Sequence, residues 1–124
     1  MATDKVFYCN GVQLAPSAEP MTVDTVFDLA SLTKPVATAA AVMVLVEEGR
    51  VRLDDPVVAY LPAFGSGGGE REKVTVEELL THRAGLVADD PMELYQGTAE
   101  EIFARKYQRR LVNLPGKRFV YSDA

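Results

Sequence analysis

The most constraining feature of this sequence is the apolar stretch from Pro35 to Val46, in which only Thr38 is polar. We expect it to form most of a helix over about residues 31–48, which Gly49 ends as a C′ residue. A helix that is apolar on every side is normally buried on every side. The stretch therefore predicts a central helix, packed inside something larger than a two-layer fragment.

The start of this helix depends on Pro35. If Asp28 were the N-cap, Pro35 would fall in the second turn, where a proline costs a hydrogen bond. A start near Ser31 keeps Pro35 close to the first turn, where proline is tolerated. The sequence favours the start near Ser31.

Composition narrows the functional classes. The 124 residues are enough for one domain or part of one, and 48% are hydrophobic and 25% charged, as in soluble globular proteins. The net charge of −5 argues against nucleic-acid binding, which needs a basic patch. Cys9 is the only cysteine, so we expect no internal disulfide and no cysteine-based zinc site. The apolar stretch is shorter than the ~20 residues that span a bilayer, and no signal peptide is visible, which favours a cytoplasmic protein.

Three shorter helices follow from start and stop signals. Asp55 and Pro56 resemble an N-cap and an N1 proline, which predicts a helix over about residues 55–61. Two capping boxes, each a threonine followed three residues later by a glutamate, predict helices over about 75–82 and 98–110.

Few strands are predicted. Residues 5–9 could form a short strand before the Asn10-Gly11 turn. Residues 22–27 and 118–121 are expected to be extended, and the glycine-rich residues 66–69 to be a flexible loop. The fold should therefore be mainly helical.

A Ser-x-x-Lys pattern, Ser31 to Lys34, opens the long helix. A serine hydroxyl is a poor nucleophile until a base takes its proton. Residues three apart share one face of a helix, so the Lys34 amine can reach the Ser31 hydroxyl. Burial or a neighbouring cation lowers the pKa of a lysine, and the neutral amine can then accept that proton. The alternative is that Ser31 only starts the helix and Lys34 is solvated.

Three blocks in order resemble the β-lactamase-related serine hydrolases: class C β-lactamases, D,D-peptidases and family VIII-type esterases. The first is Phe-Asp-Leu-Ala-Ser-Leu-Thr-Lys over residues 27–34, which resembles the nucleophile block. The second is Leu-Leu-Thr-His-Arg-Ala-Gly-Leu over residues 79–86, and the third is Tyr-Ser-Asp over residues 121–123, preceded by Pro115-Gly116. The resemblance covers about residues 22–124 and implies an α+β fold of the β-lactamase/transpeptidase-like type, here partial and mainly α-helical.

The resemblance also implies roles. Ser31 would be the acylated nucleophile, and its backbone N–H half of an oxyanion hole. Lys34 would relay the proton, and Tyr121 would be the companion base, with its phenolate stabilised by the Lys34 ammonium. Asp123 would orient Lys34 or a substrate group, with Ser122 beside it as a second orienting residue. Lactamases of this type more often carry asparagine at the position of Asp123, so the resemblance points to an esterase rather than a lactamase.

His82 and Gly85 are expected to be structural members of the second block, with His82 ending a helix. The alternative is that His82 is the base of a Ser-His-Asp triad. Asp54 and Asp55 resemble a carboxylate pair, but capping and turn chemistry explains both.

The family's third box, Lys-Thr-Gly or His-x-Gly, does not occur in the sequence. The resemblance therefore implies an N-terminal fragment, about a third of a family member. Two consequences are expected. A missing C-terminal part or self-association should cover the apolar helix. Catalysis should be weak, because losing one oxyanion donor costs about 2.7–4 kcal/mol.

We therefore expect a serine hydrolase that transfers an acyl group to Ser31 and hydrolyses a small ester or a β-lactam or D-Ala-D-Ala-like amide. No metal, cofactor, nucleic acid or membrane span is implied. The competing hypothesis is a catalytically inactive fragment that acts through helical association.

Overall fold

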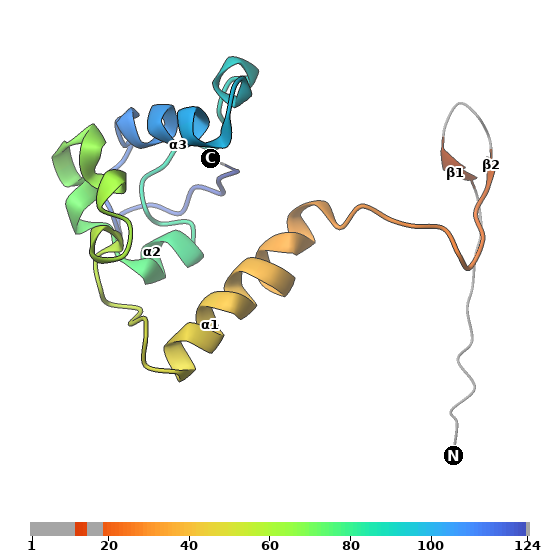
Figure 1. The fold of residues 1–124 in the computed structure, drawn as a ribbon, viewed down its shortest axis with the longest axis horizontal. Coiled ribbons are helices and arrows are strands. Elements are labelled where there is room, and N and C mark those ends of the chain that lie inside the picture. Colours follow the sequence, from red (N-terminus) through yellow and green to blue (C-terminus); the bar gives the residue numbers. More distant parts are fainter. Residues whose placement is uncertain (1–11, 15–18, 124) are drawn as a thin grey trace.

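The computed structural model describes residues 12–14 and 19–123. The expected strand over residues 5–9 and the Asn10-Gly11 turn lie outside the described residues. Near the N-terminus, β1 (Val12–Leu14) pairs antiparallel with β2 (Glu19–Pro20), with Val12 opposite Pro20 and Leu14 opposite Glu19. The rest of the described chain is helical or irregular, apart from one isolated β-bridge. It forms a body around α2 (Val76–Leu80) and α3 (Ala99–Gln108), and α1 (Ala40–Glu47) extends from that body towards the hairpin (Figure 1).

The long helix changes type along its length. A 3-10 turn over Ala30–Leu32 leads into a π-helical segment over Lys34–Ala39, and α1 continues over Ala40–Glu47. Pro35 lies at the start of the π-helical segment, where its missing N–H removes an α-helical hydrogen bond. The predicted stop at Gly49 is confirmed, because Gly49 follows the helix with φ +69°.

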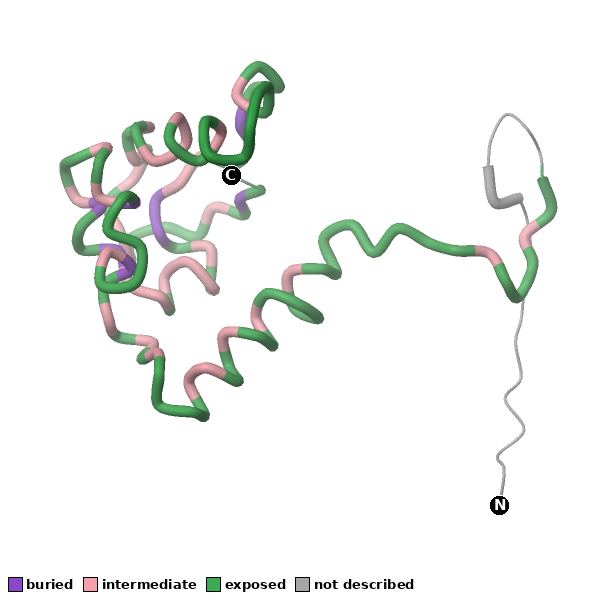
Figure 2. The backbone as a smooth tube through the Cα atoms, viewed as in Figure 1, coloured by how far each residue is buried: buried purple, intermediate pink, exposed green. Residues whose placement is uncertain are grey.

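The helix is not buried, and the prediction that it would be packed on every side is wrong for this chain. The residues of Ala30–Glu47 are exposed or half-buried (Figure 2). Val36 and Val44 expose 64% and 51% of their surfaces. The apolar pattern indicates that the helix needs a partner to cover its surface. The described residues do not supply that partner. At 18 residues, Ala30–Glu47 is also long and apolar enough to cross a membrane, by length and composition alone. The core helix of a soluble protein can have the same length and composition.

The core lies in the body. Val57, Phe64, Val74 and Ala84 are buried together, and half-buried apolar side chains from α2, α3 and the segments around them pack against this cluster. Phe64 meets Tyr107 of α3 edge-on, with ring centroids 6.0 Å apart. This small core fixes α2 and α3 relative to each other.

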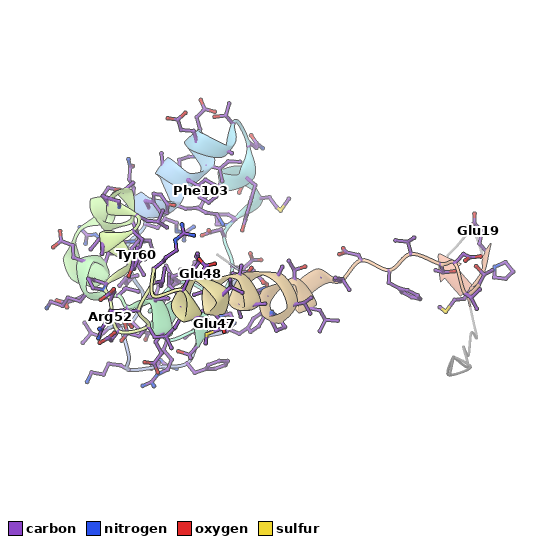
Figure 3. The ribbon with its side chains drawn as sticks, turned by 60° about the horizontal axis from the view of Figure 1, so that its bottom comes forward. Glu19, Glu47, Glu48, Arg52, Tyr60 and Phe103 are labelled. Carbon is purple, nitrogen blue, oxygen red and sulfur yellow. The ribbon has the colours of Figure 1, made fainter. Side chains whose placement is uncertain are left out.

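The predicted helix over residues 55–61 is wrong in its start. Pro56 has extended backbone (φ −65°, ψ 138°) and forms an isolated bridge with Thr75, so Asp55 is no N-cap. Only a 3-10 turn over Val57–Ala59 follows. The Asp55 carboxylate instead accepts a hydrogen bond from the Tyr60 hydroxyl. Tyr60 lies beside Arg52 near the C-terminal end of α1 (Figure 3), and its hydroxyl accepts from the Arg52 N–H at 3.2 Å.

Both predicted capping boxes form. Thr75 caps α2 (Val76–Leu80) through the Glu78 N–H, and Thr98 caps α3 (Ala99–Gln108) through the Glu101 N–H; each glutamate bonds back to the backbone N–H of its threonine. Helix α3 stops short of the expected residue 110, because Arg109 is already extended at ψ 138°.

The glycine-rich segment predicted to be a flexible loop instead lies within two 3-10 segments, Pro62–Gly67 and Gly69–Lys73. They carry Arg71, which is only 2% exposed. Its guanidinium donates to the carbonyls of Lys106 (3.1 Å) and Arg109 (2.7 Å) and so satisfies the C-terminal end of α3. Burial lowers the pKa of Arg71, and the charge of nearby Asp90 opposes that shift.

Candidate active site

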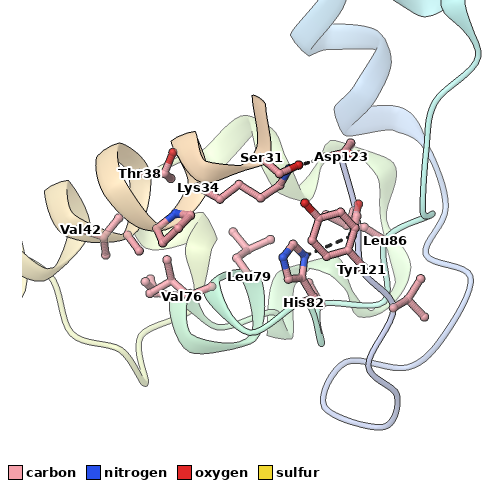
Figure 4. A pocket seen from close by; sticks show the side chains of 16 residues that line it. Ser31, Lys34, Thr38, Val42, Val76, Leu79, His82, Leu86, Tyr121 and Asp123 are labelled. Carbon is pink, nitrogen blue, oxygen red and sulfur yellow. Dashed lines mark hydrogen bonds and ion pairs between the residues drawn. The ribbon is translucent and has the colours of Figure 1, made fainter. Parts of the chain in front are cut away.

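Three distant segments meet at one cavity of about 620 Å³. The helical run Ala30–Glu47 contributes Ser31 and Lys34. The turn after α2 contributes His82, and the C-terminal segment contributes Tyr121 and Asp123 (Figure 4). The cavity wall that the helical run and α2 form away from Ser31 is mainly apolar, with Thr38 as a polar member. The structure therefore brings together polar residues that the sequence separates by up to about 90 positions, next to an apolar wall.

Ser31 and Lys34 lie one helical turn apart, as the pattern predicts. The Lys34 Nζ lies 3.4 Å from the Ser31 Oγ, a long hydrogen bond. Ser31 is exposed to solvent in the 3-10 turn that starts the run. The N–H groups on either side of Ser31 already have acceptors: the Ala30 N–H donates to the Asp28 carboxylate at 2.8 Å and the Leu32 N–H to the Leu29 carbonyl at 2.9 Å.

The surroundings of Lys34 raise its pKa rather than lower it, which favours the ammonium over a neutral amine base. Its ammonium pairs with the Asp123 carboxylate, and this hydrogen bond, with a smaller one to Tyr121, raises the pKa of Lys34 above its usual value. The raised pKa keeps Lys34 charged near neutral pH. The sequence could not show this, because Asp123 is 89 residues away.

Tyr121 has the opposite shift. Hydrogen bonds to Ser31 and then to Lys34 lower the pKa of the Tyr121 hydroxyl below its usual value. The Lys34 Nζ also lies 4.9 Å from the centroid of the Tyr121 ring. A tyrosine needs such a neighbouring cation to act as a base near neutral pH, so the arrangement supports Tyr121 rather than Lys34 as the group that accepts a proton.

His82 is not arranged as the base of a triad. Its Nδ1 accepts a hydrogen bond from the Ser122 N–H at 3.2 Å, whereas the histidine of a triad donates from Nδ1 to a carboxylate. Its ring packs against Tyr121, with centroids 4.6 Å apart, and edge-on against Phe119 at 5.9 Å. This geometry favours the structural role expected for His82 over the role of a triad base.

Ser122 and Gly85 hold the backbone around the site. The Ser122 hydroxyl donates to the Val87 carbonyl at 2.6 Å, so it anchors the loop rather than facing a substrate. Gly85 has φ +82°, and a Cβ there would lie 2.2 Å from the carbonyl oxygen of Asn113. Only glycine allows that approach.

The sequence did not reveal the residues that anchor the C-terminal loop. Besides Val87, Ala88 accepts from the Asp123 N–H at 2.9 Å. Both residues act through backbone carbonyls, which any side chain would offer, so no sequence signal marks them. Among the described residues, no group of three or more His, Cys, Asp or Glu side chains could hold a metal ion.

Comparison with known proteins identifies the family of the chain. The Beta-lactamase family model matches residues 1–124. Esterase EstB of Burkholderia gladioli is 46% identical over 72 residues, which are 56% of this chain and 18% of that protein. A putative D-alanyl-D-alanine carboxypeptidase of Salmonella paratyphi B is 32% identical over 114 residues, 82% of this chain and 26% of that protein.

Among solved structures, EstCE1, a hydrolase with promiscuous acyltransferase activity, superposes with a TM-score of 0.70 at 29% identity, over 90% of this chain and 33% of that one. Fold and sequence thus place the chain in a family of the serine hydrolase and esterase type. The chain belongs to the Beta-lactamase family. It spans a third or less of the length of these three relatives.

Proposed function

We propose that Ser31 is acylated by a small ester or amide substrate and that water then releases the acyl group. The observation that carries this proposal is the position of Tyr121, which hydrogen-bonds with Ser31 and Lys34 and has a pKa below its usual value. Tyr121 thus supplies the base that a serine hydroxyl needs.

In the first step the Ser31 Oγ attacks the substrate carbonyl carbon, and its proton passes to the Tyr121 phenolate oxygen. The Lys34 ammonium stabilises that phenolate before the transfer. The backbone N–H of Ser31 supplies half of the oxyanion hole that stabilises the tetrahedral intermediate. When the intermediate collapses, the leaving alkoxide or amine takes the proton from Tyr121. Tyr121 then takes a proton from the water that attacks the acyl carbonyl. When this second intermediate collapses, the bond from the acyl carbon to the Ser31 Oγ breaks, and Oγ takes the proton back from Tyr121 as the acid product leaves.

The substrate proposed first is a small ester. Two of the relatives described above are named as an esterase or a hydrolase with acyltransferase activity. β-Lactam and D-Ala-D-Ala-like amides are the second class, since another relative is named as a putative D-alanyl-D-alanine carboxypeptidase. Asp123 pairs with Lys34, which supports an orienting role towards that lysine.

The test is covalent labelling followed by intact mass. The purified chain is incubated separately with a fluorophosphonate and with a penicillin, beside a Ser31→Ala control. We expect a fluorophosphonate adduct that the control lacks. A folded chain without an adduct, or an adduct that survives in the control, would contradict the assignment of Ser31. A penicillin adduct would add the amide class.

The exposed apolar surface of the helical run favours one second candidate, an association function. Because the residues of Ala30–Glu47 are at most half-buried, we infer that a further part of the protein or a second copy of the chain covers this surface. A chain that associates through this helix without acylating Ser31 would be a binding module rather than an enzyme.

A further inference from the structure

We propose that His82 is a positioning residue for Tyr121, and that protonation of the His82 ring at Nδ1 removes one of the hydrogen bonds that hold the loop carrying Tyr121. The inference rests on the proposed role of Tyr121 as the base. It adds that His82 helps the carbonyls of Val87 and Ala88 to hold this loop in place and that its contribution depends on pH.

His82 bonds to the backbone on both sides of Tyr121. The Val120 N–H donates to the His82 carbonyl oxygen at 2.9 Å, and the Ser122 N–H donates to His82 Nδ1 at 3.2 Å. Tyr121 itself lies between these two bonds, with its ring over the imidazole at a centroid distance of 4.6 Å and an angle of 36°. Tyr121 is 42% exposed, and apart from the His82 ring its side chain meets Ser31 and Lys34, to which its hydroxyl bonds.

The backbone of His82 supports this interpretation. Its φ is +56°, a left-handed conformation that few residues other than glycine adopt, although asparagine, aspartate and histidine are enriched there. The His82 N–H still donates to the Leu79 carbonyl at 3.2 Å, which ends α2. This unusual backbone turns both the carbonyl and the ring of His82 towards the segment that carries Tyr121.

Nδ1 can accept a hydrogen bond only while it carries no proton. The neutral ring therefore has its proton on Nε2. A second proton on Nδ1 would place an N–H against the Ser122 N–H, donor against donor, and the bond would be lost. Histidine is the side chain whose charge ordinarily changes between about pH 5 and 8.

Charged and titratable groups surround His82, and its protonation would have two opposing effects on the rate of the reaction. Lys34, Tyr121 and Asp123 line the same cavity as His82. On the α2 side, Glu78 bonds to the Thr75 N–H, and Arg83 bonds to the Gly116 carbonyl. A charged imidazole would also stabilise the Tyr121 phenolate electrostatically, which would speed the reaction in acid. The proposal is that the loss of position outweighs this gain.

Two variants separate the roles of His82. His82→Asn keeps an acceptor, because the asparagine Oδ1 lies as many bonds from the backbone as Nδ1, and asparagine tolerates positive φ. It does not titrate. His82→Phe keeps a ring against Tyr121 and Phe119 but has no acceptor. Circular dichroism and thermal unfolding show whether each variant is folded.

The first readout is the rate of fluorophosphonate labelling of Ser31 between pH 5 and 9. We expect the unsubstituted chain to lose rate in acid with a logarithmic slope approaching about 2, from Tyr121 and His82, and His82→Asn with a slope of about 1. At pH 8, His82→Asn should label within about threefold of the unsubstituted chain and His82→Phe about 10- to 100-fold more slowly, because small displacements of a reacting group cost that much. Equal slopes, or a rate that rises in acid, would overturn the proposal.

The second readout needs no catalysis. Amide hydrogen exchange of Ser122, followed by NMR, should lose protection as the His82 ring becomes protonated, and should not do so in His82→Asn. Protection that does not change with His82 protonation overturns the inference. Protection that changes as expected in a chain that never labels leaves the inference standing and contradicts only the proposed function.

Discussion

The Lys34 ammonium pairs with the Asp123 carboxylate from the opposite side of the cavity, across 89 positions of sequence. This contact joins the helical run to the C-terminal segment and sets the charge of the lysine. It also makes Lys34 a fixed cation beside Tyr121, so the pH dependence of the site is determined by three residues together.

Asp123→Asn should move the whole pH profile of Ser31 acylation to lower pH. Asp123 raises the pKa of Lys34 through a hydrogen bond, so its loss lets Lys34 lose its proton at lower pH, and the alkaline limb moves down. The negative charge of Asp123 also raises the pKa of Tyr121, so the acid limb moves down as well. The measurement is the labelling rate from pH 5 to 11; movement of either limb to higher pH would contradict the charge assignment.

Tyr121→Phe should slow labelling of Ser31 by about 10²–10⁴-fold, the usual contribution of a general base. Ser31 and the Lys34–Asp123 pair are unchanged in this variant. Phe119→Leu is a control in the same segment, since Phe119 is not among the residues that line the cavity and meets the His82 ring edge-on, with centroids 5.9 Å apart. A Tyr121→Phe chain that labels at the unsubstituted rate would mean that another group accepts the proton.

Gly85→Ala should destabilise the fold far more than Gly49→Ala. Both glycines have positive φ, so both substitutions carry the conformational cost of about 1–2 kcal/mol. At Gly85 the new Cβ would also lie 2.2 Å from the Asn113 carbonyl oxygen, whereas nothing lies within 4 Å of a Cβ at Gly49. Chemical denaturation of both variants measures the difference, and equal losses would show that the approach of residue 113 is not rigid.

Arg71→Met should lower the free energy of unfolding by about 1–3 kcal/mol for each carbonyl left without its donor. The carbonyls are those of Lys106 and Arg109 at the end of α3. Arg110→Met is the matched control, because Arg110 is exposed and exposed substitutions usually change stability by less than about 0.5 kcal/mol. Urea denaturation of both variants distinguishes them, and a result in which Arg110→Met is the worse variant would contradict the role of Arg71.

Replacing two valines of the helical run, Val36→Glu and Val44→Glu, should reduce any association of the chain. Both side chains are more than half exposed and lie on the surface for which a covering partner is proposed. Sedimentation velocity across a concentration series measures the effect. If the unsubstituted chain remains monomeric at high concentration, a second copy is not the cover.

Local signals predicted local structure well. The two capping boxes form at Thr75 and Thr98 because each needs only residues three positions apart. Asp55 failed as a cap for a tertiary reason: Pro56 is drawn into a bridge with Thr75, nineteen positions on. The sequence did not indicate that Arg71 is buried, because a charged side chain in a glycine-rich stretch is normally solvated. Its burial depends on the carbonyls at the end of α3, which only the fold brings close.

The candidate site divides in the same way. The spacing of Ser31 and Lys34 puts them within reach of each other, and the family resemblance suggested Tyr121 and Asp123 as their partners. The direction of the Lys34 pKa shift could not be predicted, since it depends on a carboxylate from the other end of the chain. The contact of His82 with the Ser122 N–H depends on a left-handed backbone that the sequence does not announce.

Gly49, at the end of the helical run, acts mechanically as a pivot. The run from Ala30 to Glu47 is 18 residues long, so Ser31 sits at the tip of a lever of roughly 27 Å. A swing of about 5° at the pivot moves the tip by roughly 2 Å, and a misplacement of even ~1 Å can cost about 10²-fold in rate. Whatever covers α1 therefore sets the alignment of nucleophile and base as well as shielding apolar surface, and the stiffness of that cover should govern how fast the site works.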